Sequence, residues 1–200
     1  YTDTSDGVLL LEKAATNLIT YSEDFSNAAW SKTNLTITSN QVISPDGTLN
    51  ADLLLPNTNN IVHTMFTQTN TSIQTYTVFL KAGGYNYAFL GQNNTADTDG
   101  AFFDLINGIV AKNTSTLSAS IKDYGNGWFR CSLFGSFSTS FRNVCPSKNG
   151  QSFVFAGDGV KGIYSWGTQA ESGNVASSYI PSQGSASTRA AETANNAGNS

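Results

Sequence analysis

The chain has 200 residues, of which only 12% are charged, and Thr, Ser, Asn and Gly fill the difference from an average globular protein. Ten basic and fourteen acidic residues give a net charge of −4 without a basic cluster, which argues against a nucleic-acid partner. The hydrophobic fraction of 39% is too high for a disordered chain, and no run of about 18 apolar residues predicts insertion into a membrane.

Short alternating or β-branched segments, separated by turn signals, follow one another along the chain. No amphipathic helix of useful length and no internal repeat is visible, which excludes a parallel sheet with crossover helices. Residues 22–30 are expected to form a loop or one helical turn that brings Phe25 and Trp30 to the core, and residues 141–150 a loop. The expected strands are 16–21, 33–39, 48–55, 61–68, 73–82, 85–91, 101–105, 109–112, two within 118–137, 152–156 and 162–169.

Two Asn-Gly pairs mark hairpins. Asn126-Gly127 offers two residues that tolerate positive φ, as a type I′ turn requires, and Asn107-Gly108 repeats the signal upstream. After Gly127 the strand carries aromatic residues on both faces, which is typical of a central strand of a sandwiched sheet. Residues 101–137 are therefore predicted to form a four-stranded meander.

These patterns predict an all-β fold, a two-sheet antiparallel β-sandwich of the jelly-roll, carbohydrate-binding-module or lectin-like kind. Residues 1–15 are expected to be an N-terminal arm that reaches a neighbouring subunit, and residues 16–181 the sandwich. Residues 182–200 form a polar tail or linker, expected to be disordered unless a neighbouring subunit holds it.

The inventory of reactive side chains predicts no enzyme. The only histidine, His63, lies in an alternating strand and is expected to be structural, and no nucleophile elbow, phosphate loop or His/Cys cluster is present. Candidate acids lie in turns or at strand ends, where Asp commonly bonds the backbone. Cys131 and Cys145 form either a disulfide or two isolated buried thiols.

An ordered set of segments resembles β-sandwich modules of bacteriophage tail, fibre and capsid-appendage proteins. The set runs from residue 16 to residue 191, and no single member of it is diagnostic. The resemblance implies a virion-surface module related to concanavalin-like jelly rolls, without catalytic residues. The matching segments are TNLITYSEDFSNAAW (16–30), PDGTLNAD (45–52), YTVFLKAGG (76–84), FDLING (103–108), GNGWFRCS (125–132), IYSWGTQAE (163–171), SSYIP (177–181) and TRAA (188–191).

Jelly-roll modules of this kind often hold a structural calcium ion where the first and last strands meet, and Ca²⁺ requires several oxygen ligands. The resemblance therefore makes Glu23, Asp24 and Glu171 candidate ligands. The alternative is that Asp24 caps a helical turn and that Glu171 is solvated.

Sugar binding requires aromatic faces together with amide and hydroxyl groups on a loop rim. Such a mixture occurs at one end of the predicted sandwich, although its tyrosines can equally be ordinary half-exposed strand residues. Trp30, Trp128 and Trp166 belong to the family-like segments and are expected in the core. The candidate sugar-binding residues are Tyr85, Tyr87, Gln92, Asn93 and Asn94.

Three functions follow from this sequence. The first is a non-enzymatic virion-surface or tail-fibre module, assembled as a homo-oligomer, with weak binding of host or environmental polysaccharide. The second is a purely structural subunit of a virion or extracellular filament. The third is an accessory carbohydrate-binding domain of a secreted polysaccharide-degrading enzyme. The expected location is a virion surface, or otherwise the extracellular space.

Overall fold

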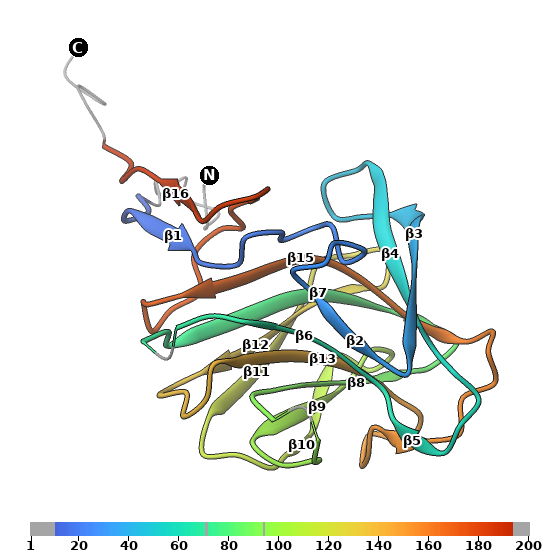
Figure 1. The fold of residues 1–200 in the computed structure, drawn as a ribbon. Helices are drawn as coiled ribbons and strands as arrows, with labels where there is room; N and C mark the ends of the chain where they lie inside the picture. Colours follow the sequence, from blue (N-terminus) through green and yellow to red (C-terminus); the bar gives the residue numbers. More distant parts are fainter. Residues whose placement is uncertain (1–10, 71, 94, 194–200) are drawn as a thin grey trace.

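The computed structural model describes residues 11–70, 72–93 and 95–193, and in these ranges all regular structure is β-strand. Two six-stranded antiparallel sheets dominate (Figure 1). The first has the order β10 (Ile109–Asn113), β9 (Gly100–Asp104), β8 (Tyr87–Gly91), β13 (Phe141–Ser147), β6 (Thr64–Gln68) and β2 (Ser31–Thr33). The second has the order β11 (Ser118–Asp123), β12 (Trp128–Phe134), β7 (Thr75–Gly83), β15 (Gly162–Glu171), β4 (Leu49–Pro56) and β3 (Leu35–Ile43).

Two small two-stranded sheets complete the fold. One pairs β1 (Ala15–Asn17) with β16 (Ser187–Arg189), and the other pairs β14 (Val154–Phe155) with β5 (Ile61–Val62). Since the described ranges contain no helix, none of their segments is a helix that could cross a membrane.

The main hydrophobic core draws side chains from both six-stranded sheets. Met65, Leu90 and Val144 of the first sheet are fully buried with Val78 and Ile163 of the second. Alternating residues of each strand point to one face, so this shared core is the inner layer of a β-sandwich-like fold. The all-β antiparallel prediction is therefore confirmed.

A second apolar cluster covers the opposite face of the second sheet. It contains Phe79, Trp128 and Trp166, with Tyr179 packed against them. Trp30 is buried in the main core beside Phe25, so the prediction that all three tryptophans are core residues is confirmed.

The hairpin around Asn126-Gly127 is confirmed. Asn126 has φ 54° and Gly127 has φ 77°, so both central residues occupy the left-handed region that a type I′ turn requires. The following strand, β12, lies between β11 and β7 and is buried on both faces, as predicted from the aromatic residues on each of its faces.

The four-stranded meander is wrong. The pair β9–β10 belongs to the first sheet and the pair β11–β12 to the second, so the chain crosses between the sheets after β10. Leu117 is buried at this crossing, and the Asn113 side chain donates to its carbonyl oxygen at 2.7 Å. Consecutive hairpins in the sequence therefore do not share a sheet.

The predicted loop at residues 141–150 is also wrong, because β13 is an inner strand of the first sheet. Arg142 and Asn143 resemble loop residues in the sequence but are fully buried. Pro146 pairs with Ala88 of β8, but it lies beyond the pairing with β6, which covers only residues 141–144, so one side of the strand is free of a ladder at the proline.

Two other predicted strands are shorter than expected. The strand expected at 16–21 is regular only over β1, and the one expected at 61–68 is divided at His63 between β5 and β6, which belong to different sheets. The two ring nitrogens of His63 each lie 2.8 Å from a main-chain carbonyl oxygen, of Asn34 and Phe155. His63 thus links Asn34, which precedes β3, to Phe155 of β14.

The cysteines do not pair. Cys131 lies in the main core and Cys145 in a cluster with Phe89 and Phe153 on the outer face of the first sheet. Burial raises the pKa of both thiols, that of Cys145 to about 12. The alternative of two isolated buried thiols is therefore confirmed.

The polar C-terminal segment is held by the N-terminal part of the same chain as far as residue 193. Gly184 N donates to Thr20 O at 2.7 Å, β16 pairs with β1, and Arg189 forms an ion pair with Glu12. These contacts lie within one chain, and the expected contact of the tail with a neighbouring subunit stays a prediction. The rest of the predicted tail, and residues 1–10 of the predicted arm, lie outside the described residues.

Candidate functional site

A groove with a volume of about 560 Å³ lies where three segments meet, and we call it the acidic groove. The loop before β2 contributes Tyr21, Glu23, Asp24 and Ser26. The β3–β4 hairpin, which extends at the upper right of Figure 1, contributes Ser39, Asn40, Asn50 and Asp52. The C-terminal segment contributes Pro181, Ser182 and Gln183.

The conformation of the groove loop that precedes β2 is stabilised by the polar side chains of that loop. Asp24 accepts hydrogen bonds from Ser26 Oγ at 2.6 Å and Asn27 N at 3.1 Å, which close a local turn. These hydrogen bonds lower the pKa of Asp24, so its exposed carboxylate is ionised at neutral pH. The indole of Trp30 donates to Tyr21 O at 2.8 Å and anchors the start of the loop to the core.

The hairpin contributes a wide β-bulge. Thr38 pairs with Leu53 and Val42 with Ala51, so three residues of β3 face the single position Asp52 on β4. Asn40, in the middle of the bulge, has φ 58°, a conformation that Asn adopts more readily than most residues. The bulge turns Ser39 and Asn40 toward the groove.

Asp52 stabilises this bulge through hydrogen bonds of its carboxylate. Its Oδ1 accepts from Asn40 N at 3.0 Å and its Oδ2 from Phe25 N at 3.4 Å, so one carboxylate joins the loop to the hairpin. The side chain is only 2% exposed. Burial, with a smaller contribution from the negative charge of Asp24, raises the pKa of Asp52 to about 6.

Glu23 is held on the other side of the groove. Its carboxylate accepts from Tyr179 Oη at 2.9 Å and from Asn50 Nδ2 at 3.4 Å. Burial is the largest cause of a raised pKa for Glu23, and the charge of Asp46 adds to it. The side-chain oxygen of Asn50 is buried and, in the described part of the chain, has no hydrogen-bond partner.

The groove therefore combines an aromatic ring, amides, hydroxyls and carboxylates on a concave surface. This set of groups binds sugars, because a sugar presents hydroxyl edges to polar groups and C–H faces to an aromatic ring. Asn40, Asp52 and Gln183 were not identified from the sequence. One signal was available for Asp52, which is the only charged residue in the strand LNADLLLP.

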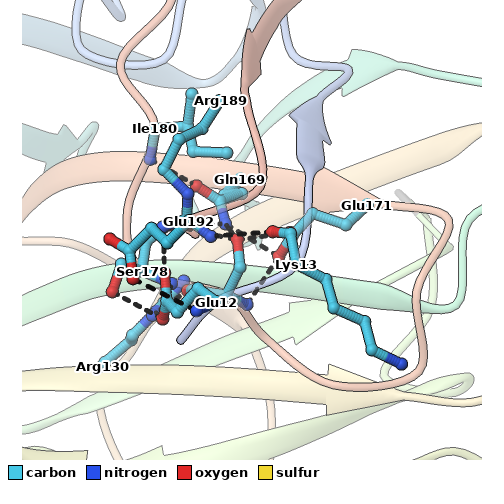
Figure 2. A network of polar contacts seen from close by, with 10 residues as sticks. Glu12, Lys13, Arg130, Gln169, Glu171, Ser178, Ile180, Arg189 and Glu192 are labelled. Atoms are coloured by element: carbon cyan, nitrogen blue, oxygen red, sulfur yellow. Dashed lines mark hydrogen bonds and ion pairs between the residues drawn. The ribbon is translucent and has the colours of Figure 1, made fainter. Parts of the chain in front are cut away.

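The calcium ligands predicted from the resemblance are not brought together. Glu23 and Asp24 line the acidic groove, whereas Glu171 is buried at the end of β15 in a separate network (Figure 2). There its carboxylate accepts from Ser177 Oγ at 2.6 Å and Gln169 Nε2 at 2.7 Å. Over residues 11–70, 72–93 and 95–193, no group of three or more acidic, His or Cys side chains is arranged to hold a metal ion.

Two of the five predicted sugar-binding residues, Tyr85 and Gln92, lie in the interior. Tyr85 is 5% exposed, and its hydroxyl accepts from Asp158 N at 3.1 Å. Gln92 is 4% exposed, and its Oε1 accepts from Ser138 N at 2.6 Å and Thr139 N at 3.2 Å. These two side chains stabilise neighbouring loops.

The other members of this set are more exposed. Tyr87 is half-buried against Gly150, where an added Cβ would lie only 2.7 Å from the tyrosine ring. Asn93 folds back on its own loop, accepting from Thr95 N at 3.1 Å and donating to Thr98 Oγ1 at 3.3 Å. Asn94 lies outside the described residues.

A scan against protein-family models gives no match to this chain, and a search of curated proteins gives none either. The class of the protein is therefore defined by its fold, a β-sandwich-like all-β chain with a polar, acidic groove.

Proposed function

We propose that the protein is a non-enzymatic jelly-roll module of a virion-surface or tail-fibre structure that binds polysaccharide weakly through the acidic groove. The observation that carries the binding function is the groove itself, where Tyr21, amides and carboxylates from three segments meet. The surface rich in hydroxyls and amides and the resemblance to phage appendage modules support the location. Assembly into a homo-oligomer is part of the proposal, because appendages of this kind display several copies.

The test is a glycan array that includes host surface polysaccharides, followed by calorimetry with any glycan that binds. We expect dissociation constants in the micromolar to millimolar range, since an open groove buries only part of a sugar. Gln183→Ala removes an exposed amide of the groove and is expected to weaken binding about threefold to tenfold.

Gln151→Ala is the matched control, because Gln151 is equally exposed and does not line the groove. Equal losses in both variants would contradict a site in the groove. A wild-type protein that binds no surface glycan would instead favour the purely structural subunit. An assay for new reducing ends serves as a check for glycan cleavage, which the proposed function excludes.

A further inference from the structure

The carboxylates of the acidic groove offer a ligand only hydrogen-bond acceptors, whereas the hydroxyls and amides of its lining can also donate. Asp24 and Glu23 present carboxylate oxygens, and the Asn50 side chain uses its N–H groups on Glu23 and Asp46. This arrangement leaves the buried carbonyl oxygen of Asn50 without a donor among the described residues. A ligand that satisfies the carboxylates of Asp24 and Glu23 must bring donors, and sugar hydroxyls are donors.

Among the described residues that line the groove, none has a cationic side chain that could balance its carboxylates. Lys32 is the cation that influences Asp24, but its ammonium group is already occupied. It donates to the main-chain oxygens of Ser26 at 2.9 Å, Asn27 at 2.8 Å and Trp30 at 2.9 Å. Lys32 therefore fixes the loop and is not available to pair with an anionic ligand.

The raised pKa values of two carboxyl groups in the groove show that negative charge is already unfavourable in its partly buried surroundings. Burial raises the pKa of Glu23 and Asp52, and neighbouring carboxylates raise both further, through Asp46 and Asp24 respectively. An anionic sugar placed in the same groove would add a like charge at short range, which low-dielectric surroundings make more unfavourable than in water.

We propose that the acidic groove selects glycans by charge, accepting uncharged sugars rich in hydroxyl groups and excluding those that carry carboxylate or sulfate. This inference depends on the proposed glycan-binding function and narrows it to a substrate class. We expect each uronic acid in the bound segment to weaken binding roughly tenfold at low ionic strength. The discrimination is expected to shrink above about 0.5 M salt, where charges at the surface are screened.

The experiment compares oligosaccharides that differ only at C6. The probes are tetrasaccharides of glucose and glucuronic acid, of galactose and galacturonic acid, and of mannose and mannuronic acid, each titrated by calorimetry at 20 mM and 500 mM NaCl. Binding of a neutral member, with weaker binding of its uronic partner at low salt, supports the inference. A uronic member that binds as tightly as its neutral partner, or more tightly, overturns it while the glycan-binding function stands.

If no member of any pair binds and the glycan array is also negative, the proposed function fails and the inference with it. Asp24→Asn provides a second measurement, because the amide keeps an oxygen for Ser26 and Asn27 while the charge is removed. This variant should reduce the neutral-to-uronic ratio about threefold. Asp123→Asn, the same change at an exposed residue outside the groove, should leave the ratio unchanged, and an equal reduction in both variants would overturn the inference.

Discussion

The acidic groove and the two segments that flank β8, with Tyr85 before the strand and Gln92 after it, contain similar residue types but differ in how their hydrogen-bonding groups are used. In the flanking segments the Tyr85 hydroxyl and the Gln92 oxygen each accept main-chain N–H groups, and both side chains are almost completely buried. In the groove, exposed Asp24 and Gln183 face the cavity.

The difference shows that a mixture of aromatic and amide residues in the sequence does not identify a sugar site. Buried polar side chains are usually satisfied within the protein, so their presence near a loop indicates loop support as often as ligand binding. Exposed groups on a concave surface are what a ligand can use. The following variants test this contrast.

The largest expected effect is that of Tyr85→Ala. The ring is buried and packs edge-on against Phe155, with centroids 5.1 Å apart, so its removal should leave a cavity and lower the free energy of unfolding by about 4 kcal/mol. Urea unfolding measures this loss. Tyr85→Phe, which removes only the hydroxyl that accepts from Asp158 N, should cost about 1 kcal/mol. An alanine variant with native stability would show that Tyr85 is a surface residue.

Asp52→Asn tests the buried carboxylate of the groove through pH. The folded-state pKa of Asp52 is about 6 against an ordinary value of 3.8, so the folded protein binds more protons than the unfolded chain between these values. The contribution of Asp52 to stability therefore falls as pH rises through about 6, and the whole fall, from below the ordinary pKa to above the folded-state pKa, is roughly 3 kcal/mol.

Asp52→Asn removes this contribution. We expect the stability of the variant, relative to wild type, to be about 2.5 kcal/mol more favourable at pH 7 than at pH 4, as measured by urea unfolding at both values. The comparison between the two proteins cancels the other titrating groups. Parallel pH profiles for variant and wild type would contradict the burial of this carboxylate.

A matched pair of glutamines tests the comparison directly. Gln92→Ala leaves the N–H groups of Ser138 and Thr139 without their acceptor and should cost about 2 kcal/mol of stability. Gln183→Ala, at an exposed amide of the groove, should change stability by less than about 0.5 kcal/mol. Thermal and urea unfolding of both variants measure the two losses. A larger loss of stability for Gln183→Ala than for Gln92→Ala would contradict the contrast between a buried structural amide and an exposed groove amide.

The smallest expected effect is at the bulge. Asn40 has a positive φ, so Asn40→Gly should preserve or slightly raise stability, by up to about 0.5 kcal/mol, whereas Asn40→Ala should cost about 1 kcal/mol. Both variants remove the amide from the groove, so both should weaken glycan binding. If Asn40→Ala is the more stable of the two, the bulge does not have this backbone conformation in solution.

Much of the fold was predictable because its signals are local. The Asn126-Gly127 turn, the burial of Phe25 and Trp30, and the alternation of the long strands depend on residues close together in the sequence. The two main errors, the loop expected at 141–150 and the meander expected at 101–137, concern which strands lie beside which. Arg142 donates to Thr139 O nearby and to the distant Asn70 O, and Asn143 donates to the distant Asn93 O, so the burial of both side chains depends in part on residues far away in the sequence.

The candidate site was predictable only in part. Glu23 and Asp24 were identified as a pair of acidic residues in one loop, and the structure places both in the acidic groove. Glu171 was grouped with them through the resemblance, but its hydrogen bonds belong to another network. Asp52 and Gln183 lie far from that loop in the sequence, so no local pattern connects them with it.

Residue patterns alone were enough to predict an antiparallel all-β protein with an apolar interior and a surface rich in uncharged polar side chains. Strand periodicity, turn residues and composition act over a few residues and need no knowledge of the rest of the chain. Which polar side chains are buried with hydrogen-bond partners, and which meet in the acidic groove, depends on the tertiary structure. The reason is physical: desolvation, and hydrogen bonds such as those from Phe25 and Asn40 to Asp52, depend on contacts between distant segments.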